Sequence, residues 1–270
     1  MAHSGPRGLT WPAMTVAAGL YLHVPFCSAV CPYCDFAVTV GGPRSRAAFV
    51  EALLAEIALV AGGPEGAWPF DTVYLGGGTP SALAADNLGR ILAAVAGAFA
   101  LAPTARVFLE ANPEDVTPAA LAAWRALGVG TLSLGVQSFA AGALVFLGRR
   151  HRLAAGRRSV ERARAAGFDT VSLDLIYGLP GQDAAAWRGD LEAAVALAPD
   201  HLSCYQLTVH EGTPLGRRRA RGELRELPEE GQAELFELTH GFLASAGYPA
   251  YEVSNFARVP EHRSRHNAKY

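Results

Sequence analysis

The sequence has no long apolar run, no excess of one charge and few cysteines. No stretch contains the roughly 18 to 20 consecutive apolar residues that a membrane-spanning helix needs, so we expect no membrane span. The 23 Lys and Arg residues nearly balance the 25 Asp and Glu residues, a net charge of -2, and no global field attracts the protein to nucleic acid. With four cysteines, nothing indicates an oxidising compartment, and we expect a cytoplasmic protein. At 270 residues and 50% hydrophobic, the chain is long enough for one large domain with a sizeable core.

Three of the four cysteines lie together. Cys27, Cys31 and Cys34 have the spacing C-x3-C-x2-C and follow a short apolar run, 19–24, that predicts a strand. Three thiolates in one loop can hold a metal centre and leave one coordination position open. The spacing therefore favours a [4Fe-4S] cluster in which one iron is free to take a ligand from outside the protein. Cys204, in an apolar strand, is expected to be buried and inert.

A structural zinc site is the alternative. His23 lies four residues before Cys27 and would supply a fourth ligand. Zinc sites usually bring their ligands as two pairs, however, and the sequence has no second Cys or His pair at such a spacing. A disulfide is disfavoured, because it pairs two thiols and would leave the third cysteine of the loop unused. The zinc site remains the weaker of two open interpretations.

Short apolar runs alternate with Ala-rich amphipathic segments, the pattern of βα units around a parallel sheet. We expect strands near 19–24, 72–75, 107–111, 131–135, 170–175 and 201–206. We expect helices near 44–61, 84–99, 118–127, 140–146, 154–166 and 184–197. Six such units predict either a doubly wound open sheet or an incomplete (β/α)6 barrel.

Beyond residue 206 the alternation weakens. We expect a polar loop with a mobile basic stretch over 208–225, a helix over 228–246, and a short strand or turn near 251–253. The first residues, 1–18, have the composition of a disordered extension.

Each expected strand ends in polar or glycine residues. The cysteines follow the first strand and G-G-G-T-P (76–80) the second, and Glu110, Gln137 and Asp174 close the next three. Because the carboxyl ends of parallel strands share one edge, a ring of this kind suits one central pocket. Each motif also has a simpler interpretation when it is taken by itself. The glycines are consistent with an ordinary tight turn, and Glu110 is consistent with a charge that faces solvent.

The cysteine motif, with Tyr33 before its last cysteine, resembles the radical S-adenosylmethionine (SAM) superfamily, in which the amino and carboxylate groups of SAM chelate the open iron. Y-L-H-V-P-F-C (21–27) and C-P-Y-C-D-F (31–36) resemble more narrowly the branch of oxygen-independent coproporphyrinogen dehydrogenases and HemW-type heme chaperones. The coproporphyrinogen enzymes carry a further cysteine where this chain has Phe36, as the chaperones do.

The resemblance implies an α/β fold, an incomplete (β/α)6 TIM-like radical SAM barrel. It implies a core barrel over 19–207 and, over 208–270, a linker and the start of a truncated HemN-type C-terminal domain, so we expect a fragment of a longer chain. It also implies a set of residues that contact SAM. These are Tyr21, Gly77, Gly78, Thr79, Glu110, Gln137, Arg149 and Asp174. For Arg149, which stands among other arginines, a surface position is the alternative.

The tail, H-N-A-K-Y (266–270), resembles the H-N-x-x-Y-W motif of the chaperone branch, which is proposed to bind heme. The resemblance implies that His266 is an axial ligand of heme iron, a role that suits an imidazole. The chain stops before the Trp, and the residues alone favour a frayed polar terminus.

Two functions follow from the resemblance. The first is a heme chaperone on a radical SAM scaffold, which binds a [4Fe-4S] cluster, SAM and heme and passes heme to acceptor proteins. The second is a radical enzyme that acts on coproporphyrinogen or a related tetrapyrrole. Both imply an electron donor, a reductase or a flavodoxin-like protein, and cleavage of SAM to a 5'-deoxyadenosyl radical. The chaperone reading leaves open whether that radical is used.

Overall fold

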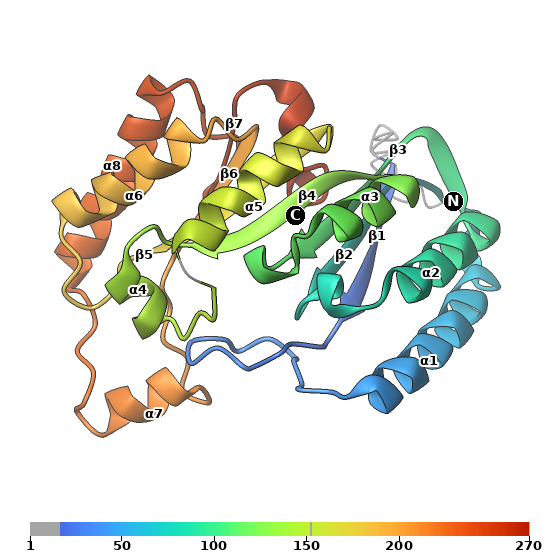
Figure 1. Cartoon of the computed structure of the whole chain (residues 1–270), viewed down its shortest axis with the longest axis horizontal. Coiled ribbons are helices and arrows are strands. Elements are labelled where there is room, and N and C mark those ends of the chain that lie inside the picture. Colours follow the sequence, from blue (N-terminus) through green and yellow to red (C-terminus); the bar gives the residue numbers. More distant parts are fainter. Residues whose placement is uncertain (1–16, 152, 270) are drawn as a thin grey trace, which may run out of the picture.

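One sheet of seven strands forms the centre of the protein and curls into an open half-barrel (Figure 1). The computed structural model describes residues 17–151 and 153–269. Most of the expected extension at 1–18 and Tyr270 of the tail therefore lie outside the described residues. Six strands are parallel, each beside the next in sequence, and the seventh is antiparallel to the sixth. The strands are β1 (Ala18–Val24), β2 (Pro69–Gly77), β3 (Ala100–Ala111), β4 (Val129–Gln137), β5 (Thr170–Tyr177), β6 (His201–Gln206) and β7 (Asn255–Ala257).

Helices lie along the convex side of the sheet (Figure 1). Those that follow the parallel strands are α1 (Pro43–Ala61), α2 (Ala85–Ala98), α3 (Pro118–Ala126), α4 (Ala141–Phe146), α5 (Leu153–Ala165) and α6 (Ala184–Ala196). The incomplete TIM-like barrel is confirmed, and the doubly wound alternative is wrong because its helices would cover both faces. Among the described residues, no helix is both long and apolar enough to cross a bilayer.

The core lies between the sheet and these helices. On β4, Leu132, Leu134 and Val136 are fully buried, and their alternation with Ser133 and Gly135 follows the period of two along a strand. Burying each such side chain stabilises the fold by about 1.5–3 kcal/mol. The alternate, small or polar positions face the concave side, where they line a cavity.

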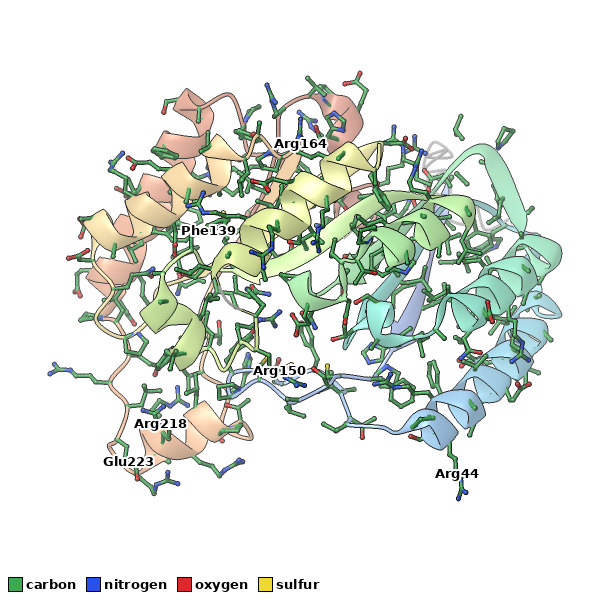
Figure 2. The ribbon with its side chains drawn as sticks, viewed as in Figure 1. Arg44, Phe139, Arg150, Arg164, Arg218 and Glu223 are labelled. Carbon is green, nitrogen blue, oxygen red and sulfur yellow. The ribbon has the colours of Figure 1, made fainter. Side chains whose placement is uncertain are left out.

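The expectation of a loop over 208–225 is wrong, because a seven-residue helix, α7 (Pro214–Ala220), lies there. Thr213 caps it by accepting a hydrogen bond from the amide of Gly216, and Pro214 occupies its first turn. The amide of Leu215, which is buried, donates to the carbonyl of Pro32 in the cysteine loop at 2.9 Å. No local sequence pattern predicts this contact, because Pro32 and Leu215 are far apart in the sequence. Figure 2 shows Arg218 and Glu223 in this α7 region at the margin of the molecule.

Near 251–253, where we expected a short strand or a turn, the chain forms bends and no strand. The structure has β7 at Asn255–Ala257 instead, after α8 (Glu229–Ser245), which matches the expected helix. Tyr251 lies in the bend before β7, where its hydroxyl contacts His201 at 2.8 Å. Cys204 is 2% exposed, as expected, and burial raises the pKa of its thiol.

The tail, residues 258–269, packs under the amino-terminal part of the sheet. Lys269 Nζ lies 2.8 Å from Asp71 Oδ1 on β2, and Arg265 donates to the carbonyl of Thr104 on β3 at 2.8 Å. A frayed terminus is therefore the wrong description up to residue 269. The division at residue 207 into a core barrel and the start of a second domain stays a prediction.

Candidate functional site

A cavity of about 420 Å³ occupies the concave side of the half-barrel and its carboxyl edge. The sequence-predicted residues that line it are Cys27, Cys31, Cys34, Gly77, Gly78, Thr79, Glu110, Gln137, Arg149 and Asp174. The expectation of one central pocket is thereby confirmed. Tyr21 and His266 are not among the lining residues and lie beside each other elsewhere, as described below.

The three cysteines lie in the loop between β1 and α1, at the carboxyl ends of the strands, where they line the cavity. The loop is anchored by the amide of Cys27, which donates to Thr39 O at 3.0 Å, and by a turn in which the amide of Cys34 donates to Cys31 O at 3.1 Å. Thr79 Oγ1 lies 3.5 Å from Cys27 Sγ, and Arg149 Nη1 lies 3.6 Å from Cys31 Sγ. Both donate toward sulfur, which stabilises negative charge on the thiols.

These thiols fit an iron–sulfur cluster better than zinc. His23, the fourth ligand in the zinc interpretation, uses Nε2 with Ala37 O at 2.8 Å and Nδ1 with Tyr21 OH at 3.2 Å. Within 17–151 and 153–269, no three His, Cys, Asp or Glu side chains are grouped so as to hold a single metal ion. A cluster distributes three thiolates over three irons, so its ligands stand further apart. Burial raises the pKa of Cys27 and Cys34, and bound iron would deprotonate these thiols outright.

The glycines at the end of β2 let this strand lie close to β1 and to the start of the cysteine loop. Gly77 has a φ of +108°, and a Cβ there would lie 2.5 Å from the His23 ring. A Cβ on Gly78 would lie 2.8 Å from the backbone of Pro25. Side chains at either position would force strand and loop apart.

Glu110 is a half-buried carboxylate on the cavity wall, and two groups donate hydrogen bonds to it. It accepts from Tyr74 OH at 2.7 Å and from the amide of Gly77 at 3.1 Å. Burial, with a contribution from the charge of Asp174, raises the pKa of Glu110 to about 7. A cationic or hydrogen-donating ligand in the cavity would stabilise its charged form.

Asp174, on β5, is the second carboxylate of the concave wall. It accepts from Ser133 Oγ at 3.0 Å, and burial raises the pKa of Asp174 to about 6. Two carboxyl groups with raised pKa values that face one cavity are typical of a functional site.

Gln137 and Arg149 close the side of the cavity at β4. Gln137 has a φ of +68°, unusual for a residue with a side chain, and its buried Oε1 has no hydrogen-bond partner in the described part of the chain. Arg149 Nη2 donates to Gly135 O at 2.9 Å and to Asn112 Oδ1, so the surface alternative for Arg149 is wrong. An unpaired buried amide oxygen beside a strained backbone points to a ligand that donates to it.

Sequence reasoning missed Asn112 and Tyr74. Asn112 connects two predicted residues, because it accepts from Arg149 and donates to Thr79 Oγ1 at 3.1 Å. The sequence signal that could have identified Asn112 was its position two residues after Glu110 in the motif E-A-N-P (110–113). Tyr74 sits within an apolar strand, where its hydroxyl gave no local sign of a partner on the next strand.

Tyr21 and His266 meet beside Tyr74, on the same side of the sheet. Their ring centroids are 5.5 Å apart, and the His266 ring stacks on Tyr74 at 4.2 Å with an interplanar angle of 25°. Burial and the charge of Lys269 lower the pKa of His266. A neutral imidazole is the form that binds a metal ion.

The fold and the cavity define a protein of the radical SAM class. The Radical SAM superfamily profile matches residues 21–194, and the chain belongs to this superfamily. The solved structure of coproporphyrinogen III oxidase (HemN) from Escherichia coli, a radical SAM enzyme, superposes with a TM-score of 0.79 at 26% identity over 91% of this chain and 57% of that one.

Curated relatives within the superfamily carry a more specific name. Heme chaperone HemW of Mycobacterium tuberculosis is 43% identical over 256 residues, which cover 93% of this chain and 65% of the relative. HemW of Escherichia coli is 36% identical, with the same coverage of both chains. The chain thus spans about two thirds of the length of these chaperones.

Proposed function

We propose that this protein is a heme chaperone on a radical SAM scaffold, with a [4Fe-4S] cluster held by Cys27, Cys31 and Cys34. The main observation behind this proposal is one cavity that is lined by the three thiols and by two half-buried carboxylates, Glu110 and Asp174. The similarity to HemW over 93% of the chain supports the same reading. The reducing cytoplasm would keep these thiols free for iron.

In this proposal SAM lies across the strand ends, with its methionine part at the glycines after β2. Glu110 accepts from its donor groups, Gln137 Oε1 receives a further hydrogen bond, and Asp174 balances positive charge. Arg149 and Thr79 hold the cysteine loop in place by donating toward sulfur. When bound, the cluster and SAM supply one-electron chemistry, while the chain orients them and excludes water.

The proposed heme ligand is His266, whose neutral imidazole suits iron. We expect the protein to bind about one heme with a Soret band typical of nitrogen ligation, and His266→Ala to shift or abolish that band. Titration with hemin, followed by absorption spectroscopy, measures this. His240→Ala, on α8, is the matched control because it also removes an imidazole. Equal heme binding by wild type and His266→Ala would remove the proposed ligand.

The second candidate is an oxidase that acts on coproporphyrinogen III or a related tetrapyrrole, favoured by the superposition on HemN. Phe36 opposes it, because the resemblance places a further cysteine there in such enzymes. We expect no protoporphyrinogen when the reduced, reconstituted protein is incubated anaerobically with SAM and coproporphyrinogen III. Product detected by fluorescence after oxidation would move the protein into the enzyme class.

A further inference from the structure

Tyr74 links the tail to the carboxylate wall of the cavity. It lies on β2, with Tyr21 of β1 as its lateral neighbour on one side and Phe108 of β3 on the other. Its ring stacks on His266 at 4.2 Å, and its hydroxyl donates to Glu110 at 2.7 Å. One side chain therefore touches both the proposed heme ligand and the proposed SAM-binding carboxylate.

The packing around Tyr74 leaves its hydroxyl little freedom. A Cβ on Gly76 would lie 2.7 Å from the Tyr74 ring and 3.0 Å from Glu110 Oε1, so the pair lies directly over this glycine. Phe108 stacks against Tyr74 at 5.6 Å, and His266 supports the same ring. Glu110 in turn accepts from Gly77, and its orientation is thus connected to the glycine loop.

We propose that Tyr74 is a positioning residue that holds Glu110 in its SAM-binding orientation and couples the tail to the SAM site through His266. The proposal rests on the proposed assignment of SAM to Glu110. In this proposal His266 acts on the SAM site by supporting the Tyr74 ring. Because coupling between two sites is reciprocal, a heme that changes the His266 stack changes SAM affinity, and SAM changes heme affinity by the same factor.

The test is a double-mutant cycle on SAM affinity, measured by calorimetry on anaerobically reconstituted protein. Tyr74→Phe keeps the ring and removes the donor, and we expect SAM to bind roughly ten-fold more weakly, as for the loss of one hydrogen bond to a charged group. His266→Ala should weaken SAM binding a few-fold, as for the loss of one aromatic contact. In the Tyr74→Phe background, His266→Ala should have no further effect on SAM affinity. Without the hydroxyl, the ring that His266 supports no longer donates a hydrogen bond to Glu110.

Tyr248→Phe is the matched control. It also removes a 2.7 Å hydrogen bond from a buried tyrosine, to the carbonyl of Pro199, outside the cavity, and it should leave SAM affinity unchanged. A second arm repeats the SAM titration with hemin present, which should shift the affinity in wild type and not in Tyr74→Phe.

The outcomes distinguish the proposed SAM site from the proposed role of Tyr74. If Glu110→Ala leaves SAM affinity unchanged, the proposed SAM site is wrong. If Glu110→Ala weakens binding while Tyr74→Phe does not, the SAM site stands and Tyr74 does not position Glu110. If the two single effects add in the double variant, Tyr74 does not carry the coupling.

Discussion

Replacing Cys34 with Ser should abolish the iron–sulfur chromophore of the reconstituted protein. Wild type should take up about four irons and four sulfides per chain after anaerobic reconstitution. The variant should not, because the two remaining thiols of the loop leave a second iron without a protein ligand, in addition to the one that is open in wild type. Iron and sulfide analysis, together with the visible absorption of the cluster, measures the result.

Cys204→Ala is the matched control, since it removes the remaining cysteine, which is 2% exposed and lies outside the loop. It should leave the iron content unchanged. Stoichiometric zinc without sulfide, lost when His23 is replaced, would restore the zinc interpretation that the engaged His23 ring now disfavours.

Affinity for SAM should rise with pH across neutrality, and Glu110→Gln should flatten this dependence. Burial raises the pKa of Glu110 to about 7, so the side chain is mostly neutral below that pH and ionised above it. The ionised form accepts hydrogen bonds more strongly and offsets the sulfonium charge of SAM. At the alkaline end, Glu110→Gln should bind roughly ten- to a hundred-fold more weakly, as expected for hydrogen bonds to a charged group.

Calorimetry from about pH 6 to about pH 8 measures this. Asp174 titrates in the same range, since burial raises its pKa to about 6, and an Asp174→Asn variant separates its part. Glu110→Ala should retain the fold and the cluster. An affinity that is the same in wild type and Glu110→Ala would show that the residue is misassigned.

The order and type of the main elements were predictable because each is encoded locally. Thr117 and Asp183, for example, cap α3 and α6, and the apolar runs of the strands mark a buried parallel sheet. β7 was missed because its partner is distant in sequence. α7 does carry a local start signal, Thr213 followed by Pro214, but the helix is short, at seven residues, and basic, and its contact with the cysteine loop is not local. The amide of Cys204 donates to Ser254 O at 2.8 Å beside β7, and Pro32 accepts from α7.

The residues of the candidate site were likewise predictable only in part. Glu110, Gln137 and Asp174 were predicted as site residues from their strand-end positions, since residues there share one edge of the sheet. What these residues touch depends on register between strands. That Tyr74 donates to Glu110, or that Asn112 stands between Arg149 and Thr79, follows from pairings that no local pattern contains.

The alternation along β4 assigns stability and ligand binding to opposite faces of the same strand. Leu132, Leu134 and Val136 secure the fold on one side, while Ser133 and Gly135 face the cavity and bury little apolar surface. Replacing Ser133 with another small residue therefore costs little of the stability margin on which a marginally stable domain depends. Such a scaffold tolerates mutation where chemistry is decided, and new ligands or reactions can evolve there without rebuilding the domain.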